Sequence, residues 1–142
     1  MFILTEKRRE NKVTIINETN YVDVAEKTIN RLKEKKDNKG KPVGLVTTSK
    51  IRNILAMGAE IYNDVLLAKD ETLDNELKGR IDYLRIRALY EAGRDSAVKS
   101  FVIEARVPDI IKEIKTKQDY ILFYRYMESL VAFHRFFGGK DM

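Results

Sequence analysis

The chain has 142 residues, of which 44% are hydrophobic and 35% are charged, so it can bury one apolar core and is not of disordered composition. It has no cysteine, which excludes disulfides, thiolate nucleophiles and cysteine-ligated zinc sites and fits a reducing cytoplasm. Lys and Arg outnumber Asp and Glu by 27 to 22, a mild preference for polyanions. No window approaches about 18 uninterrupted apolar residues, and the start is too short for a signal peptide. We therefore expect a soluble, cytoplasmic protein with no membrane partner.

Residues 1–19 mix short apolar pieces with a charged run, and we expect a loosely held N-terminal arm or a short strand. Residues 20–142 are predicted to form a single helical domain. Its first helix should begin near Asn20, a residue type that caps helix N-termini, and should fade near Lys36. The apolar stripe of this helix is Val22, Ala25, Ile29 and Leu32.

A loop from Asp37 to Val46 is predicted by its glycines and its proline. Thr47 and Thr48 then offer hydroxyl caps for a second helix. Its apolar positions recur at spacings of three and four: Ile51, Ile54, Leu55, Gly58, Ile61, Tyr62 and Val65.

A third helix, capped by Asp74 and ending near Gly93, carries an unusual stripe. Its residues alternate between arginine and tyrosine on one face: Arg80, Tyr83, Arg87, Tyr90 and Arg94. Guanidinium groups bind phosphates and flat rings stack on bases, so the stripe suits a nucleic-acid surface. The alternative is that the arginines face water and that the tyrosines pack and hold them in place.

The fourth helix should start at Asp95 and Ser96 and end at the Val107-Pro108 pair, because proline disfavours helix at the residue before it. A short fifth helix follows, and an aromatic last helix runs from about Gln118 to Phe137. Because no strand pair is evident, the predicted fold class is all-α, a compact bundle of about five to six helices.

Catalytic motifs are missing from the sequence. The only histidine, His134, lies within the apolar last helix, and it is more simply interpreted as a structural residue than as a catalytic base. There is no paired-carboxylate motif for two metal ions and no glycine-rich phosphate loop. We expect no enzymatic activity, no metal site and no cofactor.

The start of the second helix is the best candidate for polyanion binding. Free backbone N–H groups, hydroxyl donors and the cation of Lys50 meet there, with Arg52 and Asn53 just beyond. A helix N-terminus of this kind can hold a phosphate through its donors and its dipole. An ordinary threonine cap is the alternative.

Four blocks carry a family resemblance. They are NYVDVAEKTI at 20–29, LVTTSKIRNIL at 45–55, YLRIRALYEAGRD at 83–95 and FYRYMESLVAFHRFFGGKD at 123–141. In this order they closely resemble the small subunit of type III-A CRISPR interference complexes, the Csm family. The resemblance implies a helical, non-catalytic subunit that is repeated along a filament and serves antiviral and anti-plasmid defence.

The resemblance also implies the partners. They are CRISPR RNA, target RNA, the backbone repeat subunit, the large signalling subunit and further copies of the chain itself. RNA is cut by the backbone subunit, whereas the large subunit cleaves DNA and makes cyclic oligoadenylates, so neither active site is expected here. Because the guide can have any sequence, the small subunit should contact phosphates and riboses without reading bases.

The basic residues within the matching blocks are the candidate RNA contacts: Lys50, Arg52, Asn53, Arg85, Arg87 and Arg94. Lys99, Arg125 and Arg135 are candidates for secondary contacts with RNA or with a neighbouring subunit. The alternative function is a helical protein–protein adaptor without direct RNA contact, anchored through exposed aromatic residues. A third hypothesis, an unrecognised nuclease, has no motif in its support.

Overall fold

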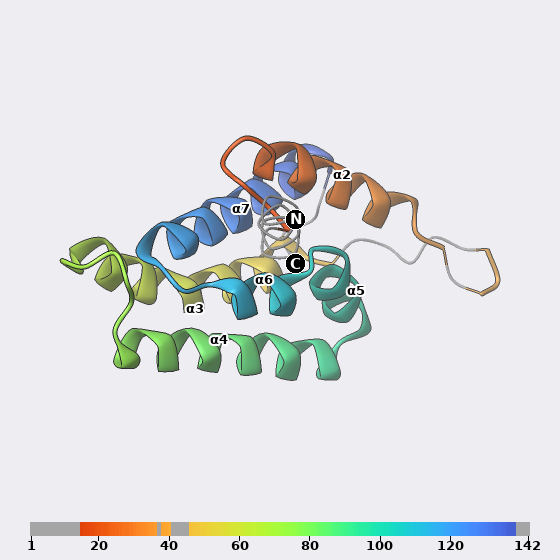
Figure 1. Ribbon diagram of the computed structural model, residues 1–142. Coiled ribbons are helices and arrows are strands. Elements are labelled where there is room, and N and C mark those ends of the chain that lie inside the picture. The colour runs from red at the N-terminus through yellow and green to blue at the C-terminus, as the bar shows by residue number, and fades with distance from the viewer. Residues whose placement is uncertain (1–14, 37, 41–45, 139–142) are drawn as a thin grey trace, which may run out of the picture.

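The structure, a computed structural model, describes residues 15–36, 38–40 and 46–138 (Figure 1). Within these ranges the chain forms six helices and no strand, with an isolated bridge between Thr72 and Thr116. The helices are α2 (Tyr21–Glu34), α3 (Thr48–Leu67), α4 (Asn75–Arg94), α5 (Ser96–Glu104), α6 (Val107–Glu113) and α7 (Lys117–Phe136). The predicted all-α bundle is confirmed. None of the described helices is both long and apolar enough to cross a membrane.

Helix α3 lies at the centre of the bundle and packs against two helices (Figure 1). On one side it contacts α7, which also packs against α2. On the other side it contacts α4, which runs in the opposite direction and also packs against α5 and α6 (Figure 1). The N-terminal end of α3 therefore lies near the C-terminal end of α4.

The α3–α7 contact is close because Gly58 has no side chain. The Tyr120 hydroxyl donates a hydrogen bond of 2.7 Å to the Gly58 carbonyl oxygen. A Cβ atom on Gly58 would lie 3.0 Å from this hydroxyl oxygen. One turn further on, the rings of Tyr62 and Tyr124 stack with centroids 4.3 Å apart. Together these contacts leave little free space between the two helices.

Two predicted helix caps are confirmed. The Asp74 side chain accepts a hydrogen bond from the Leu77 amide at the start of α4. The Asp95 side chain accepts from the Ala97 and Val98 amides at the start of α5.

The other predicted caps are wrong. The Asn20 side chain makes no cap to α2 and instead accepts from the Asn17 amide, because the preceding turn competes for it. Thr47 makes no side-chain cap to α3. The Thr48 hydroxyl is buried against His134, so it is not a surface donor either.

The predicted end of the fourth helix at Val107-Pro108 is also wrong. Helix α5 ends at Glu104, and Arg106 adopts a left-handed conformation with φ of 57° that stops it. Val107 then begins α6, with Pro108 in the first turn, where its missing N–H has no helical partner to lose. The proline thus starts a helix instead of ending one.

Most of the predicted N-terminal arm, residues 1–14, lies outside the described residues, as do Asp37 and residues 41–45 of the predicted loop. Ile16 is buried in the core, and the Ile15 amide donates a hydrogen bond to Glu113 of α6.

Candidate RNA-binding surface

A cavity of about 440 Å³ opens where the N-terminal end of α3 meets the C-terminal end of α4 and the start of α5. Its lining residues are Lys50, Asn53, Glu91, Arg94, Asp95 and Val98, which we call the Lys50–Arg94 cavity. Three predicted RNA contacts, Lys50, Asn53 and Arg94, are therefore neighbours although they come from two sequence blocks. The antiparallel packing of α3 and α4 brings them together.

The cations of this cavity are paired with carboxylates. Lys50 donates to Asp95, and the Lys50 ammonium and the Val98 amide lower the pKa of the Asp95 carboxyl. Glu91 lies 3.4 Å from Arg94 and 3.9 Å from Arg87. The side chains of Lys50 and Arg94 are 49% and 62% exposed. Exposed ion pairs contribute only about 0–1 kcal/mol each, so a phosphate can replace these carboxylates at little cost.

Tyr90 connects the two arginines of the stripe. The guanidinium carbons of Arg87 and Arg94 lie 5.9 Å and 5.5 Å from the centre of its ring. Tyr90 is 56% exposed and Tyr83 is 59% exposed, so neither is a core residue. The interpretation of both tyrosines as packing residues is wrong in that respect, although Tyr90 does hold Arg87 and Arg94 through cation–π contacts.

Three of the six primary candidates, Arg52, Arg85 and Arg87, do not line this cavity, although Arg87 lies 3.9 Å from Glu91, which does. Arg85 is on the other side of α4 from Arg87, is half-buried and lies 3.9 Å from Asp82. Arg52 is exposed on α3 and does not line the cavity. Arg80 pairs with Asp64 of α3 at 2.6 Å, which fits the reading that it lies outside the RNA-contacting set.

The secondary candidates are exposed but dispersed. Lys99 lies on α5 without lining the cavity. Arg125 and Arg135 are on α7, which is separated from α4 by α3 (Figure 1). These three residues do not extend the Lys50–Arg94 cavity.

His134 fixes the segment that leads into α3. It is fully buried, with Nε2 against the Val46 carbonyl oxygen and Nδ1 3.2 Å from the Thr48 hydroxyl. Because a carbonyl only accepts, Nε2 must carry the proton, and neutral Nδ1 then accepts from the hydroxyl. Burial lowers the pKa of the imidazole, which favours this neutral form. The interpretation of His134 as structural agrees with these contacts, and its link to the start of α3 was not predicted.

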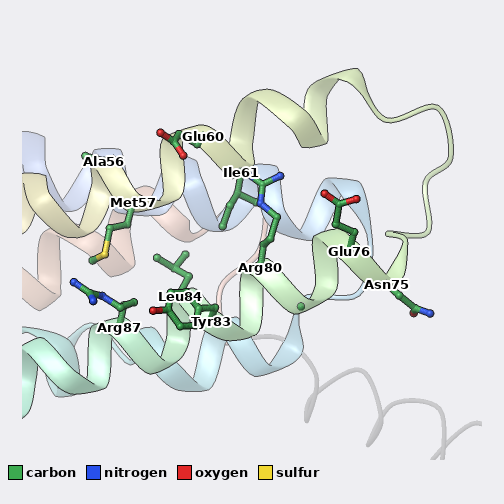
Figure 2. A pocket seen from close by; sticks show the side chains of 11 residues that line it. Ala56, Met57, Glu60, Ile61, Asn75, Glu76, Arg80, Tyr83, Leu84 and Arg87 are labelled. Atoms are coloured by element: carbon green, nitrogen blue, oxygen red, sulfur yellow. The ribbon is translucent and has the colours of Figure 1, made fainter.

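A second hollow of about 760 Å³ runs along the surface between α3 and α4, and we call it the α3–α4 groove. Figure 2 shows Met57 and Ile61 of α3 and Arg80 and Leu84 of α4 directed into the space between the helices. Arg87 lines one end of the groove, and its ion partner Glu91 lines the Lys50–Arg94 cavity. Sequence reasoning missed this groove, although the small residues Ala56 and Gly79 that line it leave room between the two helices.

These features define a small all-α protein with an exposed surface of paired cations and carboxylates. A family model described as Csm2 Type III-A matches residues 26–140. The chain is 42% identical to CRISPR system Cms protein Csm2 of Streptococcus thermophilus over 129 residues, covering 91% of this chain and 100% of that protein. It is 31% identical to the protein of the same name from Enterococcus italicus over 127 residues, covering 84% and 91%. Identity to the Mycobacterium tuberculosis protein is 35% over 97 residues, covering 68% and 78%.

The chain belongs to the Csm2 family, the small subunit of type III-A CRISPR systems. The recognised resemblance to the Csm small subunit is thereby confirmed, and the family places the chain in a Csm effector complex.

Proposed function

We propose that this subunit is non-catalytic, is repeated along the type III-A filament and contacts target RNA paired to the guide without sequence preference. The observation that carries the proposal is the Lys50–Arg94 cavity, which collects Lys50, Asn53 and Arg94 from two helices. Arg87 lies two turns before Arg94 and is joined to it through Tyr90 and Glu91. Together the four side chains present cations and an amide suited to successive phosphates or riboses.

The N-terminal end of α3 adds backbone donors to this surface. The amides of the first turn of a helix have no intrahelical acceptor, and Thr47 does not cap them. Since His134 fastens Val46 and Thr48, these amides and Lys50 have a defined position before RNA arrives. A rigid surface of this kind binds with a smaller ordering cost.

The non-catalytic role is supported by His134 itself. Both nitrogens of its ring are engaged inside the core, so the single histidine of the chain is withheld from acid–base chemistry. Among the described residues no group of three or more histidine or carboxylate side chains is placed to hold a metal ion. Incubation of the purified protein with labelled RNA and Mg²⁺ or Mn²⁺ should leave the RNA intact, and cleavage would contradict this part of the proposal.

The RNA contact is tested by the double variant Arg87→Ala/Arg94→Ala in the assembled complex. Target-RNA retention should fall by a similar factor for unrelated target sequences, with an unchanged circular dichroism spectrum. Each lost phosphate contact should reduce the slope of log affinity against log salt by about 0.7 for a single strand.

The matched control is Arg52→Ala/Arg85→Ala, which removes the same amount of charge from α3 and α4 at positions that do not line the cavity. A larger loss in the control would move the RNA contact away from the cavity. If both double variants retain RNA like the unchanged protein and no target RNA crosslinks to this subunit, the adaptor function is correct instead.

A further inference from the structure

Phe136 is the most exposed aromatic residue among the residues that the structure describes. It is the last residue of α7 and is 80% exposed. Its ring meets the edge of Phe137 at 5.3 Å, and the ammonium of Lys33 lies 4.4 Å from the centre of the Phe137 ring. The exposed Phe136 ring therefore projects from this end of the molecule, and the Lys33 ammonium lies against the neighbouring Phe137 ring. Single exposed apolar side chains are ordinary on protein surfaces, but a ring that neighbours a second ring and a cation can anchor in a groove of matching character.

The α3–α4 groove complements this ring and its cation, because it is apolar inside and carries carboxylates. Its floor is apolar, formed by Met57, Ile61 and Leu84, and Tyr83 offers an exposed ring (Figure 2). Glu60 and Glu76 lie on its rim. The groove thus fits an apolar side chain that has a cation next to it.

The carboxylates also argue against RNA as the occupant of the groove. Arg80 pairs with Asp64 at 2.6 Å and also attracts Glu60 and Glu76, but three carboxylates outnumber its single positive charge at this end of the groove. Phosphates would be repelled at this end, whereas a lysine would be attracted.

Phe136 cannot enter the groove of its own chain. His134, two residues earlier, is fastened to Thr48 at the start of α3. From Thr48 to Glu60 the helix advances about 18 Å at 1.5 Å per residue. The ring and the groove therefore lie at different places on one rigid body and can meet only between two molecules.

We propose that Phe136 of one copy of this chain inserts into the α3–α4 groove of a second copy, with Lys33 facing Glu60 and Glu76. The two surfaces differ, so the contact is heterologous and leaves one ring and one groove open for further copies. The inference rests on the proposed repetition of the subunit and names the surfaces that join neighbours. It does not depend on RNA.

The chain contains no cysteine, so engineered cysteines can trap this contact specifically. One full-length chain carries Ala132→Cys, an exposed α7 position one turn before Phe136. A second, differently tagged chain carries Asn75→Cys, an exposed residue of the groove. Without RNA, a short bismaleimide should join the two chains into a mixed dimer. The absence of a mixed dimer at high protein concentration would overturn the proposal.

Blocking variants then identify the surfaces. Gly79 lines the groove and a Cβ there meets no atom within 4 Å, so Gly79→Leu should fill the groove without disturbing α4. In the Asn75→Cys chain this change should reduce the mixed dimer at least tenfold, as should Phe136→Ser in the other chain. Gly93→Leu is the matched control, because Gly93 is equally open on α4 but lies outside the groove. This variant should leave the amount of mixed dimer unchanged.

Equal crosslinking with Gly79→Leu and Gly93→Leu would overturn the proposal. So would an unchanged mixed dimer combined with weaker RNA retention for Gly79→Leu, because the groove would then be an RNA subsite. Loss of RNA retention in the Arg87→Ala/Arg94→Ala variant is a separate measurement, so failure of the proposed function is distinguishable from failure of this contact.

Discussion

The two sides of α3 differ in how completely they are closed. Toward α7, Gly58 meets the Tyr120 hydroxyl, and the Thr48 hydroxyl meets His134 in the core. Toward α4, the same helix borders hollows of about 440 Å³ and 760 Å³ with charged rims. The contacts on the closed side determine where α3 lies, whereas the open side exposes polar side chains of α3 such as Lys50 and Asn53. The α7-facing side of α3 therefore accounts for stability, and the α4-facing side carries the binding that we propose.

The largest effect should come from opening the closed side at His134. His134→Ala removes the hydrogen-bond partner of Thr48 and of the Val46 carbonyl and leaves a cavity in the core. We expect a loss of about 3 kcal/mol in the free energy of unfolding, measured by urea denaturation. Arg87→Ala on the open side should change it by less than about 0.5 kcal/mol. Similar losses for both variants would remove the distinction between the two sides.

Alanine at two glycines should have opposite effects. Gly58→Ala places a Cβ 3.0 Å from the hydroxyl oxygen of the buried Tyr120 side chain, which must give way, and we expect a loss of about 1–2 kcal/mol. At Gly79 the Cβ meets nothing within 4 Å, so Gly79→Ala should stabilise the protein by up to about 1 kcal/mol through helix propensity alone. Thermal unfolding measures both, and a destabilised Gly79→Ala would show that the groove is closed in solution.

The closed side should also make stability depend on pH. The folded-state pKa of His134 lies below its ordinary value of 6.5, so on acidification the unfolded chain binds the proton first. Unfolding free energy should therefore fall as the pH drops below about 6.5, by at most about 1.4 kcal/mol per pH unit. Denaturation of the unchanged protein between pH 7.5 and 5.5 measures this slope.

His134→Gln is the control for this slope, because an amide can donate and accept without titrating. Burial raises the pKa of Glu113, which acts with the opposite sign in both proteins and cancels in their difference. The lowered pKa of Asp95 matters only near and below its ordinary value of 3.8. Parallel pH profiles for the two proteins would show that the fold does not lower the pKa of His134.

The helices were predictable because their signals are local. Apolar residues at spacings of three and four gave all six described helices to within a few residues, and the Asp74 and Asp95 caps followed from residue type. The caps at Asn20 and Thr48 failed because other groups, Asn17 nearby and His134 far along the chain, compete for the same side chains. Local sequence does not reveal such competition.

The candidate surface was predictable only in part. Sequence alone named Lys50, Asn53 and Arg94 separately, because each lies in a basic block. That they share one cavity depends on how α3 and α4 are rotated and staggered, which is a property of the packed bundle. For the same reason the Lys50–Asp95 ion pair and the separation of Arg85 from Arg87 were not apparent.

The smallest effect tests the open side through Asp95, which pairs with Lys50 and, under the proposed function, would compete with a phosphate for it. Asp95→Asn removes the carboxylate charge, yet asparagine caps a helix about as well, so α5 should persist. We expect the assembled complex to bind target RNA about two- to fivefold more tightly at low salt, because one repulsive charge near the phosphates is lost.

Asp74→Asn is the matched control, since Asp74 caps α4 at the end remote from the Lys50–Arg94 cavity. It should leave RNA affinity unchanged. Because the gain from Asp95→Asn is electrostatic between exposed groups, it should also vanish near 1 M salt, where the screening length is about 3 Å. Equal gains for the two variants would indicate a general effect of net charge. Weaker binding of Asp95→Asn alone would mean that Asp95 orients Lys50 toward RNA instead of competing with it.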